Sequence, residues 1–168
     1  MRRWVHGFAT ALALAAGPLA LADPEEETAI EVRDPDYKAA KGAIERKDWN
    51  EALGRLEKVA LREPDNADVH NLLGFSQRNL GRYDAAFKHY RRALALDPRH
   101  KGAHEYIGET YLKVGDLASA EKHLAALRDL CPLSCEQLKD LEREIAEYKK
   151  TGDRPLVPPA RKSGTDQR

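Results

Sequence analysis

The sequence predicts an all-α protein in which helix pairs stack into a superhelical solenoid. Pro64, Pro98 and Pro132 stand 34 residues apart, and apolar residues recur at helical spacing between them. The same interval separates several small residues, namely Gly74 and Gly108, Gly81 and Gly115, and Ala52, Ala86 and Ala120. A fixed period of this length is typical of proteins built from repeated helix pairs. We therefore expect three helix-turn-helix units followed by a capping helix.

The central unit, residues 67–100, shows the pattern most clearly. Two amphipathic stretches, 67–80 and 83–96, meet at Gly81, which breaks the helical pattern. Asp97-Pro98 ends the second stretch, because proline cannot continue a helix. The neighbouring units repeat this arrangement, with helices expected at 36–46 and 49–62 in the first unit (about 33–66) and at 101–114 and 117–130 in the third (101–133). Together with the cap, they form a predicted domain over residues 35–150.

The predicted capping helix covers residues 134–150. We expect it to begin at Ser134, which is placed to form a capping box with Gln137. Its apolar residues lie on one stripe, and charged residues occupy the other face. A helix of this kind covers the exposed side of the last repeat and presents a polar face to water.

The units resemble the tetratricopeptide repeat, which has a leucine-glycine pair, an aromatic residue, an alanine, a second aromatic residue and a proline. In the central unit these are Leu73-Gly74, Tyr83, Ala86, Tyr90 and Pro98. The third unit matches with Ile107-Gly108, Tyr111, Ala120, Leu124 and Pro132. The first unit matches less well, since Ala39-Ala40 replaces the leucine-glycine pair and Lys47 replaces the turn glycine. The resemblance covers about residues 33–132.

The resemblance implies that the first helices of successive units line a concave groove that binds peptides or partner proteins. The groove residues predicted on this basis are Tyr37, Lys41, Asn71, Phe75, Arg78, Glu105, Glu109 and Lys113. Phe75 has two interpretations, as an anchor for a partner or as an aromatic that fills a gap between units. Some family members clamp a chaperone's terminal carboxylate with lysines and asparagines. Leu72, Gly102 and Tyr106 occupy places where such polar groups are expected, so we do not predict that specificity.

The ends of the chain have the composition of processing and linker segments. Residues 1–22 combine Arg2 and Arg3, a short apolar stretch and the small-x-small site Ala20-Leu21-Ala22, which predicts a cleaved signal peptide. Residues 23–34 are predicted to form an acidic flexible lead-in, and residues 151–168 a disordered, proline-rich tail. We therefore expect a periplasmic or secreted protein without stable membrane insertion.

Charge and motifs exclude several functions. The 28 basic and 28 acidic residues balance, so there is no basic footprint for nucleic acid. The sequence contains no convergent set of acid, base and nucleophile, which predicts a non-enzymatic protein without cofactors. His70 and His104, like His89 and His123, occupy repeat-equivalent positions too far apart to share a metal ion. His100 and His104 form at best a weak metal site, so none is predicted.

The cysteine pair is the sharper chemical signal. Cys131 and Cys135 lie at the junction between the third unit and the cap, and an exported chain meets oxidising conditions. We favour a structural disulfide over a redox-active thiol pair or a copper(I) site. The predicted function is accordingly a protein-interaction scaffold or adaptor in the cell envelope, with unknown oligomeric state. The alternative is a thiol-redox or metal-handling accessory protein acting through the two cysteines.

Overall fold

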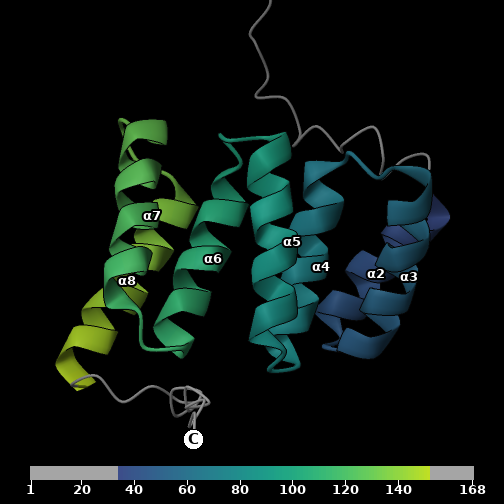
Figure 1. The fold of residues 1–168 in the computed structure, drawn as a ribbon, viewed down its shortest axis with the longest axis horizontal. Coiled ribbons are helices and arrows are strands. Elements are labelled where there is room, and N and C mark those ends of the chain that lie inside the picture. Colours follow the sequence, from purple (N-terminus) through teal and green to yellow (C-terminus); the bar gives the residue numbers. More distant parts are fainter. Residues whose placement is uncertain (1–33, 152–168) are drawn as a thin grey trace, which may run out of the picture.

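The structure, a computed structural model, describes residues 34–151, and every regular element in that range is a helix (Figure 1). The elements are α2 (Pro35–Glu45), α3 (Trp49–Arg62), α4 (Ala67–Asn79), α5 (Tyr83–Leu96), α6 (Lys101–Lys113), α7 (Leu117–Leu130) and α8 (Glu136–Thr151). The predicted all-α solenoid is confirmed, and each helix begins and ends within two residues of its predicted bounds. The predicted signal peptide, the lead-in up to residue 33 and the tail from residue 152 lie outside the described residues.

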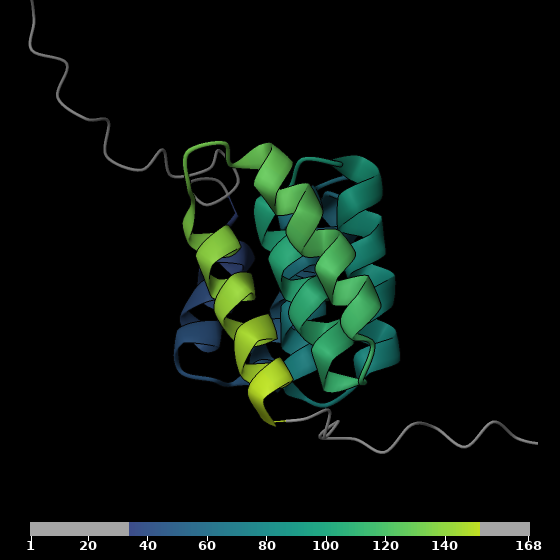
Figure 2. The same cartoon turned by 90° about the vertical axis from the view of Figure 1, so that its left-hand side faces the viewer.

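The helices form three pairs, α2 with α3, α4 with α5 and α6 with α7, and α8 packs against α6 and α7. Figure 1 shows the pairs following one another along the long axis of the molecule, and Figure 2 shows α7 and α8 together at one end. None of the described helices is long and apolar enough to cross a membrane.

The turns within the three pairs share one backbone conformation. Lys47, Gly81 and Gly115, which are repeat-equivalent, have φ values of 60°, 73° and 82°. The next residue closes each turn, as in the hydrogen bond of 2.9 Å that the Arg82 amide donates to the Gln77 carbonyl. Glycine adopts positive φ without a steric penalty, whereas the Cβ atom of Lys47 makes this backbone conformation unfavourable. Lysine in place of glycine therefore makes the turn of the first unit less favourable in free energy but leaves its backbone shape unchanged.

The pairs begin with side-chain caps. Asn66 accepts a hydrogen bond of 3.1 Å from the Val69 amide, and the equivalent His100 accepts one of 3.1 Å from the Ala103 amide. Asp34 caps α2, is 9% exposed and also pairs with Arg62 at 2.8 Å. Asp34, predicted as part of the lead-in, therefore belongs to the folded unit.

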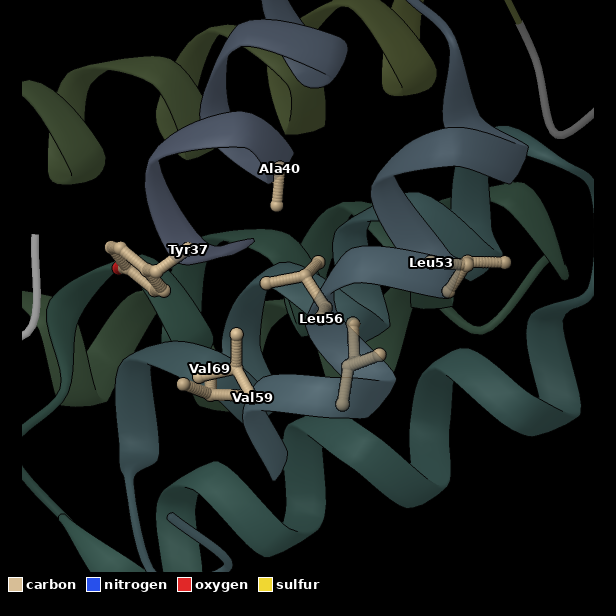
Figure 3. Packing of buried hydrophobic residues seen from close by; sticks show 7 residues of the cluster. Tyr37, Ala40, Leu53, Leu56, Val59 and Val69 are labelled. Carbon is tan, nitrogen blue, oxygen red and sulfur yellow. The ribbon is translucent and has the colours of Figure 1, made fainter. Parts of the chain in front are cut away.

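Each unit buries small and apolar residues between its two helices. Figure 3 shows this core in the first unit, where Leu56 and Val59 of α3 meet Tyr37 of α2 and Val69 of α4. Glycine permits the closest approach in the later units. A Cβ on Gly74 would lie 2.6 Å from the Tyr90 ring, and one on Gly108 would lie 2.7 Å from Leu141. The two mid-helix glycines therefore allow contacts that a larger residue would prevent.

Helix α8 caps the stack by burying Leu141 and Ile145, which are 0% and 4% exposed, in a cluster with α6 and α7 residues. It begins at Glu136, so Cys135 occupies the N-cap position and its carbonyl accepts from the Lys139 amide at 3.2 Å. The predicted capping box between Ser134 and Gln137 is therefore wrong, because the helix starts one residue later than that box requires.

Candidate functional site

The predicted groove residues divide into a buried member, a packed cluster and an acidic region. Tyr37 is 5% exposed and lies in the core of the first unit (Figure 3), so its prediction as a groove-lining side chain is corrected. Lys41, also on α2, is exposed. The α4 and α6 residues are brought together, as the ion pair between Arg78 and Glu109 shows.

Phe75 and Arg78 form a packed cluster that crosses all three units. The Phe75 ring lies 5.7 Å from that of Trp49 and 4.8 Å from that of Tyr106, measured between centroids. The Arg78 guanidinium carbon lies 5.2 Å from the Phe75 centroid and 5.4 Å from the Tyr106 centroid. Of its two interpretations, Phe75 thus fits the filling of a gap between units.

Glu105 of α6 has the most strongly shifted pKa among the predicted groove residues. It is only 8% exposed. Burial, reinforced by the charges of Glu109, Asp140 and Glu136, raises the pKa of Glu105 to about 8, while nearby Arg78 partly opposes the rise. Carboxylates from α8 and α6 therefore surround one another, and Glu105 is largely protonated at neutral pH.

Asn71, the repeat equivalent of Glu105, carries a second unusual group. It is 6% exposed, and its Oδ1 atom is buried without a hydrogen-bond partner among residues 34–151. Buried polar atoms are normally hydrogen-bonded, so an orphaned acceptor calls for an explanation. Asn71, Glu105, Glu109, Glu136 and Asp140 are called the acidic groove below. The α8 members, Glu136 and Asp140, were not predicted as groove residues, because their approach to α6 depends on how the cap docks.

A cleft extends from the same surface. It has a volume of about 350 Å³ and is lined by Arg78, Asn79, Tyr83, Glu109, Lys113 and Glu144. Its walls come from α4, α5, α6 and α8. Lys113, a predicted groove residue, therefore lines a recess next to the acidic groove and supplies it with a basic side chain.

The histidines pair within units. His70 Nδ1 lies 3.3 Å from His89 Nδ1, and His104 Nδ1 lies 3.0 Å from His123 Nδ1. Burial, then the neighbouring His104, lowers the pKa of His123 to about 4. His100 serves instead as the cap of α6 and lies 3.0 Å from Asp68, so both its ring nitrogens are engaged. The shared 19-residue interval was the sequence signal for these pairs.

Cys131 and Cys135 also lie together. Their Cα atoms are 5.8 Å apart, a separation that a disulfide spans. Cys131 is 6% exposed and ends α7, while Cys135 precedes α8. The arrangement is compatible with the predicted disulfide.

Comparison with known proteins agrees with this architecture. The sequence model of the tetratricopeptide repeat matches residues 67–100. Two Arabidopsis thaliana proteins, inactive TPR repeat-containing thioredoxin TTL3 and TPR repeat-containing thioredoxin TTL4, are each 27% identical to the chain. The matches cover 64% and 76% of this chain but only 16% and 20% of the two relatives.

Solved structures show the same fold. The TPR2B domain of yeast Sti1 in its complex with an Hsp70 peptide has a TM-score of 0.64 at 17% identity, covering 70% of this chain and 95% of that domain. The Yersinia enterocolitica type III secretion translocator chaperone SycD gives 0.63 at 18% identity, with coverages of 69% and 82%. The first TPR domain of RPAP3, bound to the HSP90 peptide SRMEEVD, gives 0.60 at 18% identity, with coverages of 68% and 90%.

Proposed function

Since this chain is a tetratricopeptide repeat protein, we propose that it is a non-enzymatic scaffold whose acidic groove binds a cationic segment of a partner protein. The resemblance in fold to domains solved with bound peptides supports a peptide or protein partner. The chemistry of the groove supports the class of partner.

The proposal rests on two buried groups of the acidic groove. Asn71 Oδ1 has no hydrogen-bond partner among residues 34–151, and burial with neighbouring carboxylates raises the pKa of Glu105 to about 8. A lysine or arginine side chain entering the groove donates to the Asn71 oxygen and stabilises the ionised form of Glu105. Its charge also offsets the mutual repulsion of Glu105, Glu109, Glu136 and Asp140. A ligand of this kind therefore lowers the free-energy cost of burying the Asn71 oxygen without a partner and the cost of the repulsion between the carboxylates.

An acidic peptide is a poor occupant by the same reasoning. The RPAP3 domain was solved with SRMEEVD, a segment that contains two consecutive glutamates and ends in aspartate. Comparable carboxylates placed beside Glu105 would add like charges to a region where burial already disfavours them. The groove therefore favours a partner of opposite charge.

We further propose that the protein acts outside the cytoplasm, in the cell envelope or beyond it. The support is the predicted signal peptide of residues 1–22, with its apolar stretch and Ala20-Leu21-Ala22 cleavage site. N-terminal sequencing of the protein isolated from its native cells should begin at Asp23. A chain that keeps Met1 contradicts export by cleavage.

A peptide array tests the proposed partner class. The array holds hexapeptides in which one position at a time carries each residue type, and it is probed with the labelled protein. The best binder is then compared with a version in which norleucine replaces its basic residue. Loss of the charged hydrogen bonds should weaken binding by about 10-fold or more, since such bonds contribute ~1.5–3 kcal/mol. Selection of acidic peptides, or equal binding of the norleucine version, would contradict a cationic partner.

Two variants place the binding in the groove. Glu105→Gln should weaken binding of the basic peptide and leave binding of its norleucine version unchanged, because the amide keeps the shape of the side chain but cannot ionise beside the bound cation. Glu57→Gln, on the exposed side of α3, is the matched control and should change neither. If both peptides bind the Glu105 variant as they bind the wild type, the acidic groove is not the binding site.

A further inference from the structure

We propose that the histidine pairs His70–His89 and His104–His123 are two binding sites for a divalent first-row transition-metal ion that accepts imidazole nitrogen, such as Zn²⁺ or Ni²⁺. Each pair joins the two helices of one unit, α4 with α5 and α6 with α7. The proposal does not depend on the acidic groove: Asn71 and Glu105 of that groove follow His70 and His104 in the chain, but no residue of the groove belongs to either pair.

The distance between the ring nitrogens fits a shared ion. Two nitrogens bound at about 2.0–2.1 Å, with an angle between square-planar and tetrahedral values, lie roughly 2.8–3.4 Å apart. The observed Nδ1–Nδ1 separations are 3.3 Å in the α4–α5 pair and 3.0 Å in the α6–α7 pair. In the structure the two Nδ1 atoms of each pair face each other along a hydrogen bond, with ring centroids 5.6 Å and 5.2 Å apart. A bound ion replaces that hydrogen bond and requires each ring to turn by roughly 30–40°, so that both lone pairs point at the ion.

The hydrogen bonds of the second ring nitrogen prepare the first for a metal. His70 Nε2 lies 2.9 Å from the Pro64 carbonyl oxygen, and His104 Nε2 lies 3.1 Å from that of Pro98. A carbonyl only accepts, so Nε2 of His70 and His104 carries the hydrogen, and the Nδ1 lone pair of each accepts the hydrogen bond from the partner ring. A bound ion takes the place of the hydrogen on Nδ1 of His89 or His123, and that hydrogen moves to Nε2 of the same ring. Metal-binding histidines typically donate their other N–H to a carbonyl or carboxylate in this way.

The first unit shows that the fold does not itself require histidine here. The positions equivalent to His70 and His89 are Asp36 and Arg55, which form an ion pair of 2.9 Å between the same two helices. An ion pair between the two helices is therefore as compatible with the fold as a histidine pair. The histidines in the second and third units add a metal-binding chemistry that the ion pair lacks.

Each proposed site supplies two protein ligands. In the described part of the chain, no group of three or more His, Cys, Asp or Glu residues is placed to hold a metal. The four histidines are only partly buried, so water can fill the remaining coordination positions. Binding should consequently be reversible and weaker than at a four-ligand structural zinc site.

The first unit also supplies the variants for the test. His70→Asp with His89→Arg, and His104→Asp with His123→Arg, install the ion pair of the first unit and keep a polar link between the helices. Calorimetric titration of the full oxidised chain with ZnCl₂ should show two equivalents that the combined variant lacks. Each double variant should lose one equivalent, and His100→Asn, which leaves both pairs intact, should lose none.

Unchanged zinc binding in the combined variant would overturn the proposal, and so would a wild-type chain that binds no zinc beyond that variant. A double variant that keeps both equivalents would overturn the assignment of the pair it replaces. Circular dichroism checks that the variants remain helical. If they do not, ¹⁵N NMR of the wild-type imidazoles decides: zinc should shift the Nδ1 signals of the four paired histidines, and an absence of such shifts refutes the sites.

Discussion

Replacing Glu105 with glutamine should remove much of the pH dependence of stability between about pH 4.5 and 8. Burial first, and then the charges of Glu109, Asp140 and Glu136, raises the pKa of Glu105 from 4.5 to about 8, with Arg78 opposing them. In that range the folded chain holds a proton that the unfolded chain releases. The contribution of the neutral carboxyl to stability is therefore complete below pH 4.5 and is lost as pH rises through 8.

The size of the effect follows from the shift in pKa. Each unit corresponds to 1.36 kcal/mol, so a shift from 4.5 to about 8 sets an upper bound of ~5 kcal/mol. The neighbouring carboxylates reach water, since the side chains of Glu109 and Asp140 are 16% and 25% exposed, and solvent screening reduces their charge interactions with Glu105. We therefore expect the free energy of unfolding to fall by ~1–2 kcal/mol between pH 5 and 8.5 on account of Glu105. A glutamine has nearly the same shape, and the equivalent Asn71 already places an amide there.

Urea denaturation at pH 5, 6.5 and 8.5 measures this difference. The wild type should lose more stability than Glu105→Gln across the series, and the variant should be the more stable of the two at pH 8.5. Glu57→Gln, an exposed control, should follow the wild type. Parallel curves for wild type and Glu105→Gln would show that this carboxyl keeps an ordinary pKa, and the electrostatic account of the groove would then be wrong.

Three further experiments test the architecture. Lys47→Gly should stabilise the first unit by ~0.5–1 kcal/mol in urea denaturation, because φ is 60° there; a loss of stability would contradict the strained turn. Truncation before Ser134 should uncover Leu127 and its neighbours and cause aggregation in light scattering, whereas a monomeric product with an unchanged Tm would contradict the capping role of α8. Mass spectrometry without reductant should find Cys131 linked to Cys135, and serine at both positions should lower Tm by a few degrees, since so short a loop contributes only ~2 kcal/mol; two free thiols would favour redox chemistry.

The helices and turns were predictable because they depend on local signals. Gly81 and Gly115 mark turns that need positive φ, and Pro64 and Pro98 mark the ends of units. The 34-residue period then placed weaker signals, so that even the turn at Lys47 was expected at the correct residue. The start of α8 was misplaced by local reasoning, since Ser134 offered a good capping sequence that the chain does not use.

The site was less predictable, because it depends on contacts between helices. The raised pKa of Glu105 requires α8 to bring Glu136 and Asp140 alongside α6, and no pattern within α6 reveals this. Tyr37 was assigned to the groove from its place on the first helix, yet the ring turns into the core. The histidine pairs were overlooked because we compared equivalent positions in successive units and not opposite positions in one unit.

The contact between Leu141 and Gly108 depends on a difference between the second and third units. In the central unit the space above Gly74 is filled by the Tyr90 ring, whereas the third unit has the smaller Leu124 in the equivalent place. Leu141 of the terminal helix occupies the room left over Gly108. The terminal helix therefore takes over, with Leu141, the space-filling role that the Tyr90 ring has within the second unit, so that replacing Leu124 with a larger aromatic residue would compete with the docking of α8.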